Sequence, residues 1–247
     1  LTSLYLSAAF RSGRRHARAH PVTARRFRLD TSPTQLAAFR AFYGLPAGFL
    51  PLSYFFILAT RPQLALMNDR ACPVPSPLGL VQTGLTVSRL SNLAELPATL
   101  EIETRIELGE GPWLTASARI GDLADVTAVF FDRAKRTRDA ASPGPSIPDH
   151  PRPGRAGTKI AFGADRGRRY ARVSGDWNPI HLGHLPARLF GFRAPIVHGL
   201  DSVSTILAHL GQQHSDLLEV RFMKPVFLPA TVELVSSGDA RDRSFRL

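Results

Sequence analysis

The sequence predicts an α+β fold built on antiparallel sheet, and three observations indicate it. Runs of alternating or β-branched residues, typical of strands, recur along most of the chain. One long amphipathic helix is predicted near the carboxyl end, and a shorter helical pattern occurs in the first half. A segment rich in Pro and Gly separates two halves of similar content, so the 247 residues are long enough to form two domains.

The first half begins with helical patterns and continues as a series of strands. A short helix is predicted near 32–43, and a loop follows from Tyr43 to Tyr54. The central helix of this half is predicted over 62–69, because Pro62 suits a first helical position. Four strands are then predicted, over 78–88, 98–108, 113–120 and 126–131.

The second half follows a linker over 139–156, which lacks apolar periodicity. Strands are predicted over 159–162, 217–223 and 230–235 around one helix. That helix is expected over 197–210, because its apolar residues fall on one face at helical spacing: Val197, Leu200, Val203, Ile206, Leu207 and Leu210.

An acid and an imidazole lie five positions apart in the stretch 170–181, which reads Tyr-Ala-Arg-Val-Ser-Gly-Asp-Trp-Asn-Pro-Ile-His. On a helix, Asp176 and His181 would lie about 140° apart at roughly 100° per residue, and on a strand they would face opposite sides. Gly175 and Pro179 both favour an end to the helix here. We therefore expect an irregular loop that directs both side chains to one point.

This stretch resembles the signature of the MaoC-like dehydratases, also called (R)-specific enoyl-CoA hydratases or hydratase 2. Every position of the pattern Tyr/Phe-x-x-x-Ser-Gly-Asp-x-Asn-Pro-(aliphatic)-His is filled. Two further blocks are similar to those of the family, Pro-Ile-Val-His-Gly-Leu at 195–200 and Phe-Met-Lys-Pro-Val-Phe-Leu-Pro at 222–229. The resemblance covers about residues 157 to 237.

The resemblance implies a double hotdog fold, with two antiparallel sheets each wrapped around a central helix. The first half lacks the Gly-Asp-x-Asn-Pro-x-His pattern. We therefore expect a non-catalytic hotdog over 1–138, a linker over 139–156 and a catalytic MaoC-like hotdog over 157–247. The second half is expected to stop about one strand short of a complete hotdog of the family.

The family also implies an activity and its residues. Asp176 and His181 would form a dyad that interconverts trans-2-enoyl and (3R)-hydroxyacyl thioesters of coenzyme A or an acyl carrier protein, without metal or redox cofactor. Asn178 is expected to orient the loop or the dyad, and the backbone N–H of Gly199 to stabilise the thioester oxygen. From the residues of the first half we expect its uncharged aromatic stretch to line an acyl pocket through Phe49, Leu50, Phe55 and Phe56, with packing in the core as the alternative for these side chains.

Other interpretations of these residues stay open. His181 and His184, with Asp176 and His198, suggest a metal site, but their spacing matches no established ligand set. His198 alone is more typical of a structural histidine bonded to backbone. A non-catalytic acyl-thioester-binding or assembly protein on the same fold is the alternative function, and the intact dyad favours the enzyme.

The chain is strongly basic, with a net charge of +11, and among its basic residues only Lys135, Lys159 and Lys224 are lysines. A basic surface suits nucleic acid, the phosphates of coenzyme A or an acidic carrier protein. We expect no nucleic-acid binding, because no strip of interleaved arginines and aromatic residues is found. A homodimer stays open.

The location of the protein is predicted from three features. The single Cys72 fits a reducing compartment, which favours the cytoplasm. The arginine-rich first thirty residues leave a mitochondrial transit peptide as the lesser alternative. Residues 41–60 are uncharged, but Gly and Pro interrupt them, so no membrane span is expected.

Overall fold

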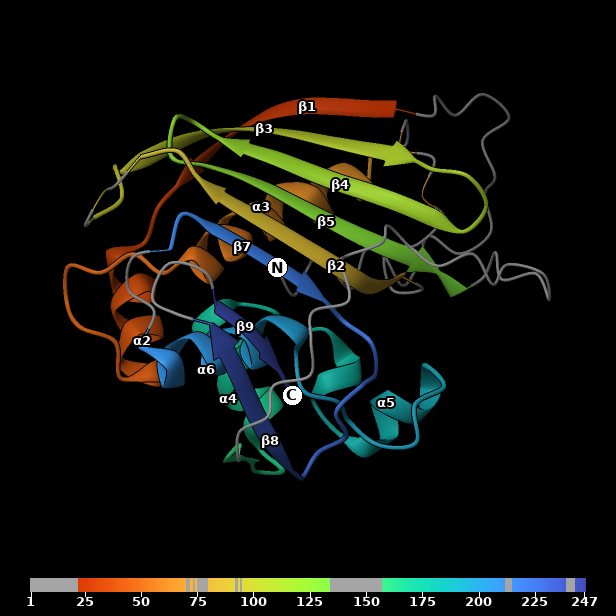
Figure 1. Ribbon diagram of the computed structural model, residues 1–247. Coiled ribbons are helices and arrows are strands. Elements are labelled where there is room, and N and C mark those ends of the chain that lie inside the picture. The colour runs from red at the N-terminus through yellow and green to blue at the C-terminus, as the bar shows by residue number, and fades with distance from the viewer. Residues whose placement is uncertain are drawn as a thin grey trace.

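The structure is a computed structural model, and it describes residues 22–69, 72, 74, 80–91, 93, 95–133, 157–211, 215–238 and 243–247. A six-stranded antiparallel sheet forms the upper layer in Figure 1, with helices beneath it, and a three-stranded sheet packs on the lower helices. The prediction of an α+β fold with two antiparallel sheets is confirmed.

The large sheet has the strand order β1-β3-β4-β5-β2-β7. Alternation decides which of its faces is buried: in β3 the side chains of Leu100, Ile102 and Ile106 lie in the core, while Glu101 and Glu103 are exposed. The four predicted strands are all present within about two residues of their expected ends. The bounds are β1 Val22–Asp30, β2 Leu80–Arg89, β3 Thr99–Leu108, β4 Trp113–Ile120, β5 Ala124–Asp132 and β7 Leu217–Arg221.

Strand β7 comes from the second half of the sequence but lies at the edge of the large sheet. It pairs with β2, with Val220 opposite Leu85. The two halves therefore share backbone hydrogen bonds. Residues 139–156, the predicted linker, lie outside the described residues, and the boundaries at 138 and 157 stay predictions.

The helical part of the first half differs from its prediction. Helix α2 (Pro33–Tyr43) lies where it was expected, with the Ser32 side chain as its N-cap and Gly44 in the left-handed region at its end. Helix α3, however, runs over Leu52–Met67, so the helix predicted over 62–69 begins ten residues earlier, inside the expected loop, and Pro62 is in its interior.

The cause of that error is burial. Helix α3 is packed on nearly all sides, and 13 of its 16 residues are buried, including Phe55, Ala59 and Gln63. A helix that is apolar all round has no amphipathic period to recognise. Pro62 cannot donate the backbone hydrogen bond that would close its turn.

The second half contains the short strands and helices that carry the signature stretch. Helix α6 begins at Gly199, two residues after its predicted start, and packs Ile206 against the small sheet. Strand β9 was not predicted, and it adds a third strand to the small sheet in the order β6-β8-β9. The bounds are β6 Thr158–Phe162, α4 Arg166–Ser174, the 3-10 helix η3 Pro179–His181, α5 His184–Leu189, α6 Gly199–Leu210, β8 Ala230–Gly238 and β9 Arg243–Arg246.

One hydrophobic core joins the halves beneath the large sheet. Phe55 of α3 and Leu200 and Val203 of α6 belong to the same cluster of buried residues. None of the helices in the described part of the chain is long and apolar enough to cross a membrane.

Candidate active site

The signature stretch leaves α4 through a tight turn that fixes the backbone of Asp176. Gly175 ends the helix in the left-handed region with φ of 77°, which glycine adopts at little cost. The Ser174 hydroxyl donates to the Tyr170 carbonyl at 2.9 Å and accepts from the Asp176 N–H at 3.1 Å. The Asp176 carboxylate in turn accepts from the Asn178 N–H at 3.1 Å. The expected irregular loop is therefore held by its own hydrogen bonds.

Asn178 supports the loop at its second bend. Its side-chain oxygen accepts from the Ile180 N–H at 3.4 Å, and Pro179 occupies the first position of η3. The side chain also lines the cavity described below. Asn178 therefore helps to hold the loop, and its role in orienting the dyad stays a prediction.

His181 is buried, and its ring is fixed in one orientation. Its Nδ1 lies 2.8 Å from the Ile196 carbonyl oxygen. Because a carbonyl only accepts, Nδ1 carries the hydrogen and Nε2 keeps a lone pair. Burial lowers the pKa of His181, and the Asp176 carboxylate opposes this by a smaller amount. The imidazole is therefore neutral at neutral pH.

Gly167 of α4 makes room for His181. A Cβ atom at Gly167 would lie 1.9 Å from the His181 carbonyl oxygen, so no side chain fits there. The signature pattern does not include this position, and nothing in the sequence singled it out. Helix α4 therefore touches the backbone of the imidazole-bearing residue and carries Asp176 on the turn after its last residue.

His198 contacts both His181 and Asp176. Its ring stacks on that of His181, with centroids 3.7 Å apart and 24° between the planes. Its Nε2 lies 3.1 Å from the backbone oxygen of Asp176, and its Nδ1 is buried without a hydrogen-bond partner among the described residues. Burial lowers the pKa of His198 well below its ordinary value, so this ring is also neutral. The expected bond from this histidine to backbone is present.

One ligand atom each of Asp176, His181 and His198 lies within 4.8 Å of the others. An imidazole binds a metal through a lone pair in its own ring plane. Two rings stacked nearly parallel direct their lone pairs along separate planes, so the geometry disfavours one shared ion. His184 is exposed on α5 and is not part of this group.

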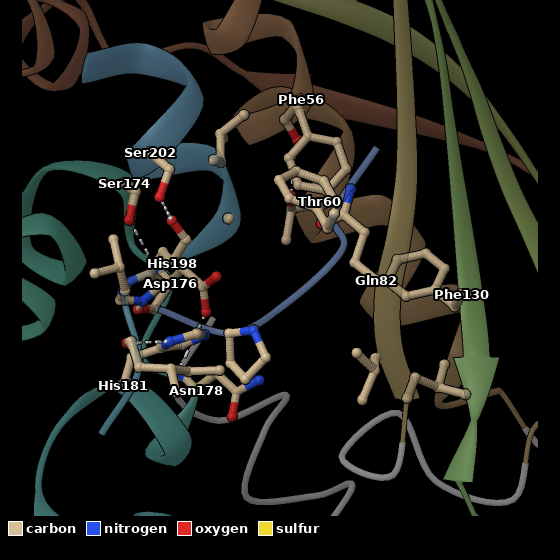
Figure 2. A pocket seen from close by; sticks show the side chains of 18 of the residues that line it. Phe56, Thr60, Gln82, Phe130, Ser174, Asp176, Asn178, His181, His198 and Ser202 are labelled. Carbon is tan, nitrogen blue, oxygen red and sulfur yellow. Dashed lines mark hydrogen bonds between the residues drawn. The ribbon is translucent and has the colours of Figure 1, made fainter. Parts of the chain in front are cut away.

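The three residues open onto a cavity of about 260 Å³ between the two halves. In Figure 2, Asp176, Asn178, His181 and His198 occupy one side, and Phe56, Thr60, Gln82 and Phe130 lie across from them. Gly199, the first residue of α6, also lines the cavity, and a Cβ atom there would lie 2.8 Å from the Phe222 ring. The polar wall thus comes from the second half and much of the apolar wall from the first.

The four residues expected to line the acyl pocket do not lie together in the structure. Phe56 lines this cavity, while Phe49 lines a second, much smaller one. Leu50 and Phe55 are in the core instead. For Phe55 the reason is the geometry of helix α3, whose side chains point in all directions around its axis, so that Phe55 faces the core while Phe56 faces the cavity. The wall is made instead by residues at helical spacing and by the facing strands, among them Ile57, Thr60, Leu64, Met67, Leu80 and Phe130.

A buried ion pair fixes the two helices that carry the site. Arg166 at the start of α4 donates to both oxygens of Asp201 on α6, at 2.7 and 2.8 Å, and Asp201 is fully buried. Tyr43 of α2, in the first half, donates its hydroxyl to Asp201 at 2.7 Å. Sequence reasoning missed this cluster because its members are 35 and 158 residues apart and share no local pattern.

Comparisons with known proteins agree with this description. The MaoC like domain family matches residues 146–244. The chain is 31% identical over 221 residues to 3-hydroxyacyl-thioester dehydratase X of Mycobacterium tuberculosis, covering 85% of this chain and 79% of that protein. It is 34% identical over 106 residues to peroxisomal multifunctional enzyme type 2 of Mus musculus, of which it covers only 14%.

Solved structures show the same fold. A crystal structure of HtdX from Mycobacterium tuberculosis aligns with a TM-score of 0.70 and 26% identity over 92% of this chain and 94% of that one. A MaoC-like dehydratase from Phytophthora capsici aligns with a TM-score of 0.60 and 18% identity, over 89% of this chain and 86% of that one. The chain therefore belongs to the MaoC-like dehydratase family and is a hydro-lyase.

Proposed function

We propose that the protein interconverts trans-2-enoyl and (3R)-hydroxyacyl thioesters, carried by coenzyme A or an acyl carrier protein. One observation carries this proposal: a carboxylate and a neutral imidazole converge on one side of an apolar cavity, beside the first residue of a helix. The hydrogen-bonded turn and the Ile196 carbonyl hold both groups in place before any substrate enters.

In the hydration direction, the dyad would hold one water between the Asp176 carboxylate and the lone pair on His181 Nε2. The water oxygen forms a bond to C3 as one of its protons passes to the dyad, and the electron pair of the double bond moves into the thioester as an enolate. The dyad then gives that proton to C2. Because both groups would contact the same water, we assign the proton to the pair and not to either residue alone. Dehydration is the same path in reverse.

The developing negative charge on the thioester oxygen needs a donor. Gly199 begins α6, and the first N–H groups of a helix have no partner inside it. The dipole of the helix favours negative charge at this end. We assign the Gly199 N–H to this oxygen, because the residue lines the same cavity as the dyad and has no side chain to obstruct the thioester.

Two finer points of the proposal depend on the dyad and on the family. The hydroxyl comes from the water that the dyad holds and the proton comes from the dyad itself, so both arrive on the same face of the double bond. The (3R) configuration is what membership of this family implies. We also expect the cytoplasm as the location.

The alternative weighed from the sequence, a protein that binds acyl thioesters or assembles with other proteins without catalysis, does not fit a hydro-lyase of this family. The preformed dyad favours the enzyme, because Asp176 and His181 make the hydrogen bonds that position them for chemistry. We expect no binding of nucleic acid.

The test is an assay of the purified protein with trans-2-enoyl-CoA substrates of graded length. The conjugated double bond is followed by its loss of absorbance, and the product is analysed by chiral chromatography. Loss of absorbance with formation of the (3R)-hydroxyacyl product supports the proposal. Binding of the substrates without turnover would support the non-catalytic alternative, and a (3S) product would refute the stereochemical assignment.

A further inference from the structure

Three strongly exposed apolar side chains lie near the opening of the cavity. Leu185, Leu189 and Met223 are 72%, 77% and 70% exposed, more than any other large apolar residue in the described part of the chain. Leu185 and Leu189 are four residues apart on α5 and therefore share one face of that helix. Neighbouring exposed apolar side chains of this kind mark interaction surfaces.

The position of the opening follows from which lining residues are exposed. Of the residues that line the cavity, only Met223, Lys224 and Pro225 are exposed, so the segment 222–229 forms the rim. Helix α5 is held next to the cavity, because the N–H of Phe192, which lines the cavity, donates to the Ala187 carbonyl of α5 at 3.0 Å. The guanidinium of Arg193, just after α5, lies 4.3 Å from the centre of the Phe227 ring.

The same surface is basic and without carboxylates in its own segments. Residues 177–200 and 220–229 contain no Asp or Glu. Four exposed cations lie in these two segments, and none forms an ion pair with a carboxylate among the described residues: Arg188, Arg193, Arg221 and Lys224. Such cations attract an acidic partner and orient it as it approaches.

We propose that Leu185, Arg188, Leu189, Arg193 and Met223, here called the docking face, bind an acyl carrier protein. This inference rests on the proposed function and names the carrier of its substrate. The carrier is an acidic protein that delivers its acyl chain on a flexible arm, so its body must rest beside the opening. Coenzyme A requires cations for its phosphates but gives no role to Leu185 and Leu189, which do not line the cavity.

Binding of the carrier protein tests the docking face without relying on catalysis. The probe is the acyl carrier protein of the same organism loaded with a saturated octanoyl group, which cannot react. We expect Leu189→Glu and Arg188→Glu each to raise the Kd at least tenfold. The control Arg246→Glu, on strand β9, should leave it unchanged, and added salt should weaken binding to the unaltered protein. A Kd unchanged in both α5 variants would overturn the docking face.

Kinetics with two carriers give the second test. For octenoyl carrier protein, the α5 variants should lower kcat/KM at least tenfold, while for octenoyl-CoA kcat/KM should stay within about twofold of the original. An equal loss with both carriers would overturn the inference, because the helix would then support the cavity in general. Failure of the unaltered protein on both thioesters, with carrier binding still sensitive to Leu189→Glu, would refute the proposed function and leave the docking face standing.

Discussion

The two halves each place a helix against antiparallel sheet, yet they use that helix differently. In the first half, α3 is buried on nearly all sides, and the segment before it, residues 44–51, offers no acid and no histidine. In the second half, α6 begins at the cavity, and the loop that faces its first residue carries Asp176 and His181. In the proposed mechanism the chemistry therefore depends on the turn after α4 and the start of α6, while α3 lines the apolar wall of the cavity.

The largest effects are expected from the dyad, which only the second half possesses. Asp176→Asn and His181→Gln should each lower kcat for hydration by ~10²–10⁴-fold, the usual contribution of a general acid or base. Thermal unfolding followed by circular dichroism should show that both variants remain folded. Turnover near the original rate in either folded variant would remove that residue from the dyad.

The start of α6 should give the next largest effect. Gly199→Pro removes the backbone N–H and should lower kcat by about 10²–10³-fold. Any Cβ atom at this position meets the Phe222 ring, so Gly199→Ala is the matched control that adds the Cβ atom and keeps the N–H. Equal losses in the two variants would mean that crowding against Phe222, and not the missing donor, causes the effect.

The contacts between the halves are tested through Asp201. Asp201→Asn leaves Arg166 without its buried carboxylate and should lower the free energy of unfolding by about 3 kcal/mol, near the low end for a broken buried pair because Arg166 is partly exposed. Tyr43→Phe removes one hydrogen bond to the same carboxylate and should cost about 1 kcal/mol. Urea unfolding measures both. A change below about 0.5 kcal/mol in Asp201→Asn would show that the pair does not hold the helices together.

The pH dependence follows from burial of His181. Its folded pKa is lowered, so the neutral base persists below pH 6.5, its ordinary value, and kcat/KM should fall only in more acid solution, up to tenfold per pH unit. The free energy of unfolding also decreases in acid. The unfolded chain takes up protons at these histidines near pH 6.5, whereas burial lowers the pKa of His181 and His198 in the folded protein. Their contribution is complete above pH 6.5 and decreases below it.

A pH–rate profile and urea unfolding at each pH separate these two effects. An acid limb of kcat/KM centred above pH 6.5, in protein that remains folded, would contradict a buried neutral His181.

The smallest effect concerns the apolar wall that α3 provides. Thr60→Phe should fill part of the cavity and lower kcat/KM for long acyl chains, by about fourfold per methylene denied burial, since each is worth about 0.8 kcal/mol. Four-carbon substrates should be nearly unaffected. Thr60→Val is the control, because Val has about the size of Thr and should leave the cavity unfilled. The same fractional loss at every chain length would show that Thr60 does not contact the acyl chain.

The sequence predicts best where a local pattern determines the structure. The strands alternate, Gly175 and Pro179 end a helix, and the signature brings Asp176 and His181 together as expected. The sequence predicts poorly those features that depend on contacts between distant parts of the chain. Helix α3 lacks an amphipathic period because nearly all of its residues are buried, and the bond from Tyr43 to Asp201 joins residues 158 positions apart.

The central claim is that Asp176 and His181 act as one unit on one water. The most direct measurement is the hydration rate of the double variant Asp176→Asn/His181→Gln beside the two single variants, with folding verified in each. When two residues act as one unit, replacing the second lowers the rate little further once the first has been replaced. We predict that the double variant is about as slow as the slower single variant. A rate reduced by the product of the two single losses would show that the residues act independently and would contradict the dyad.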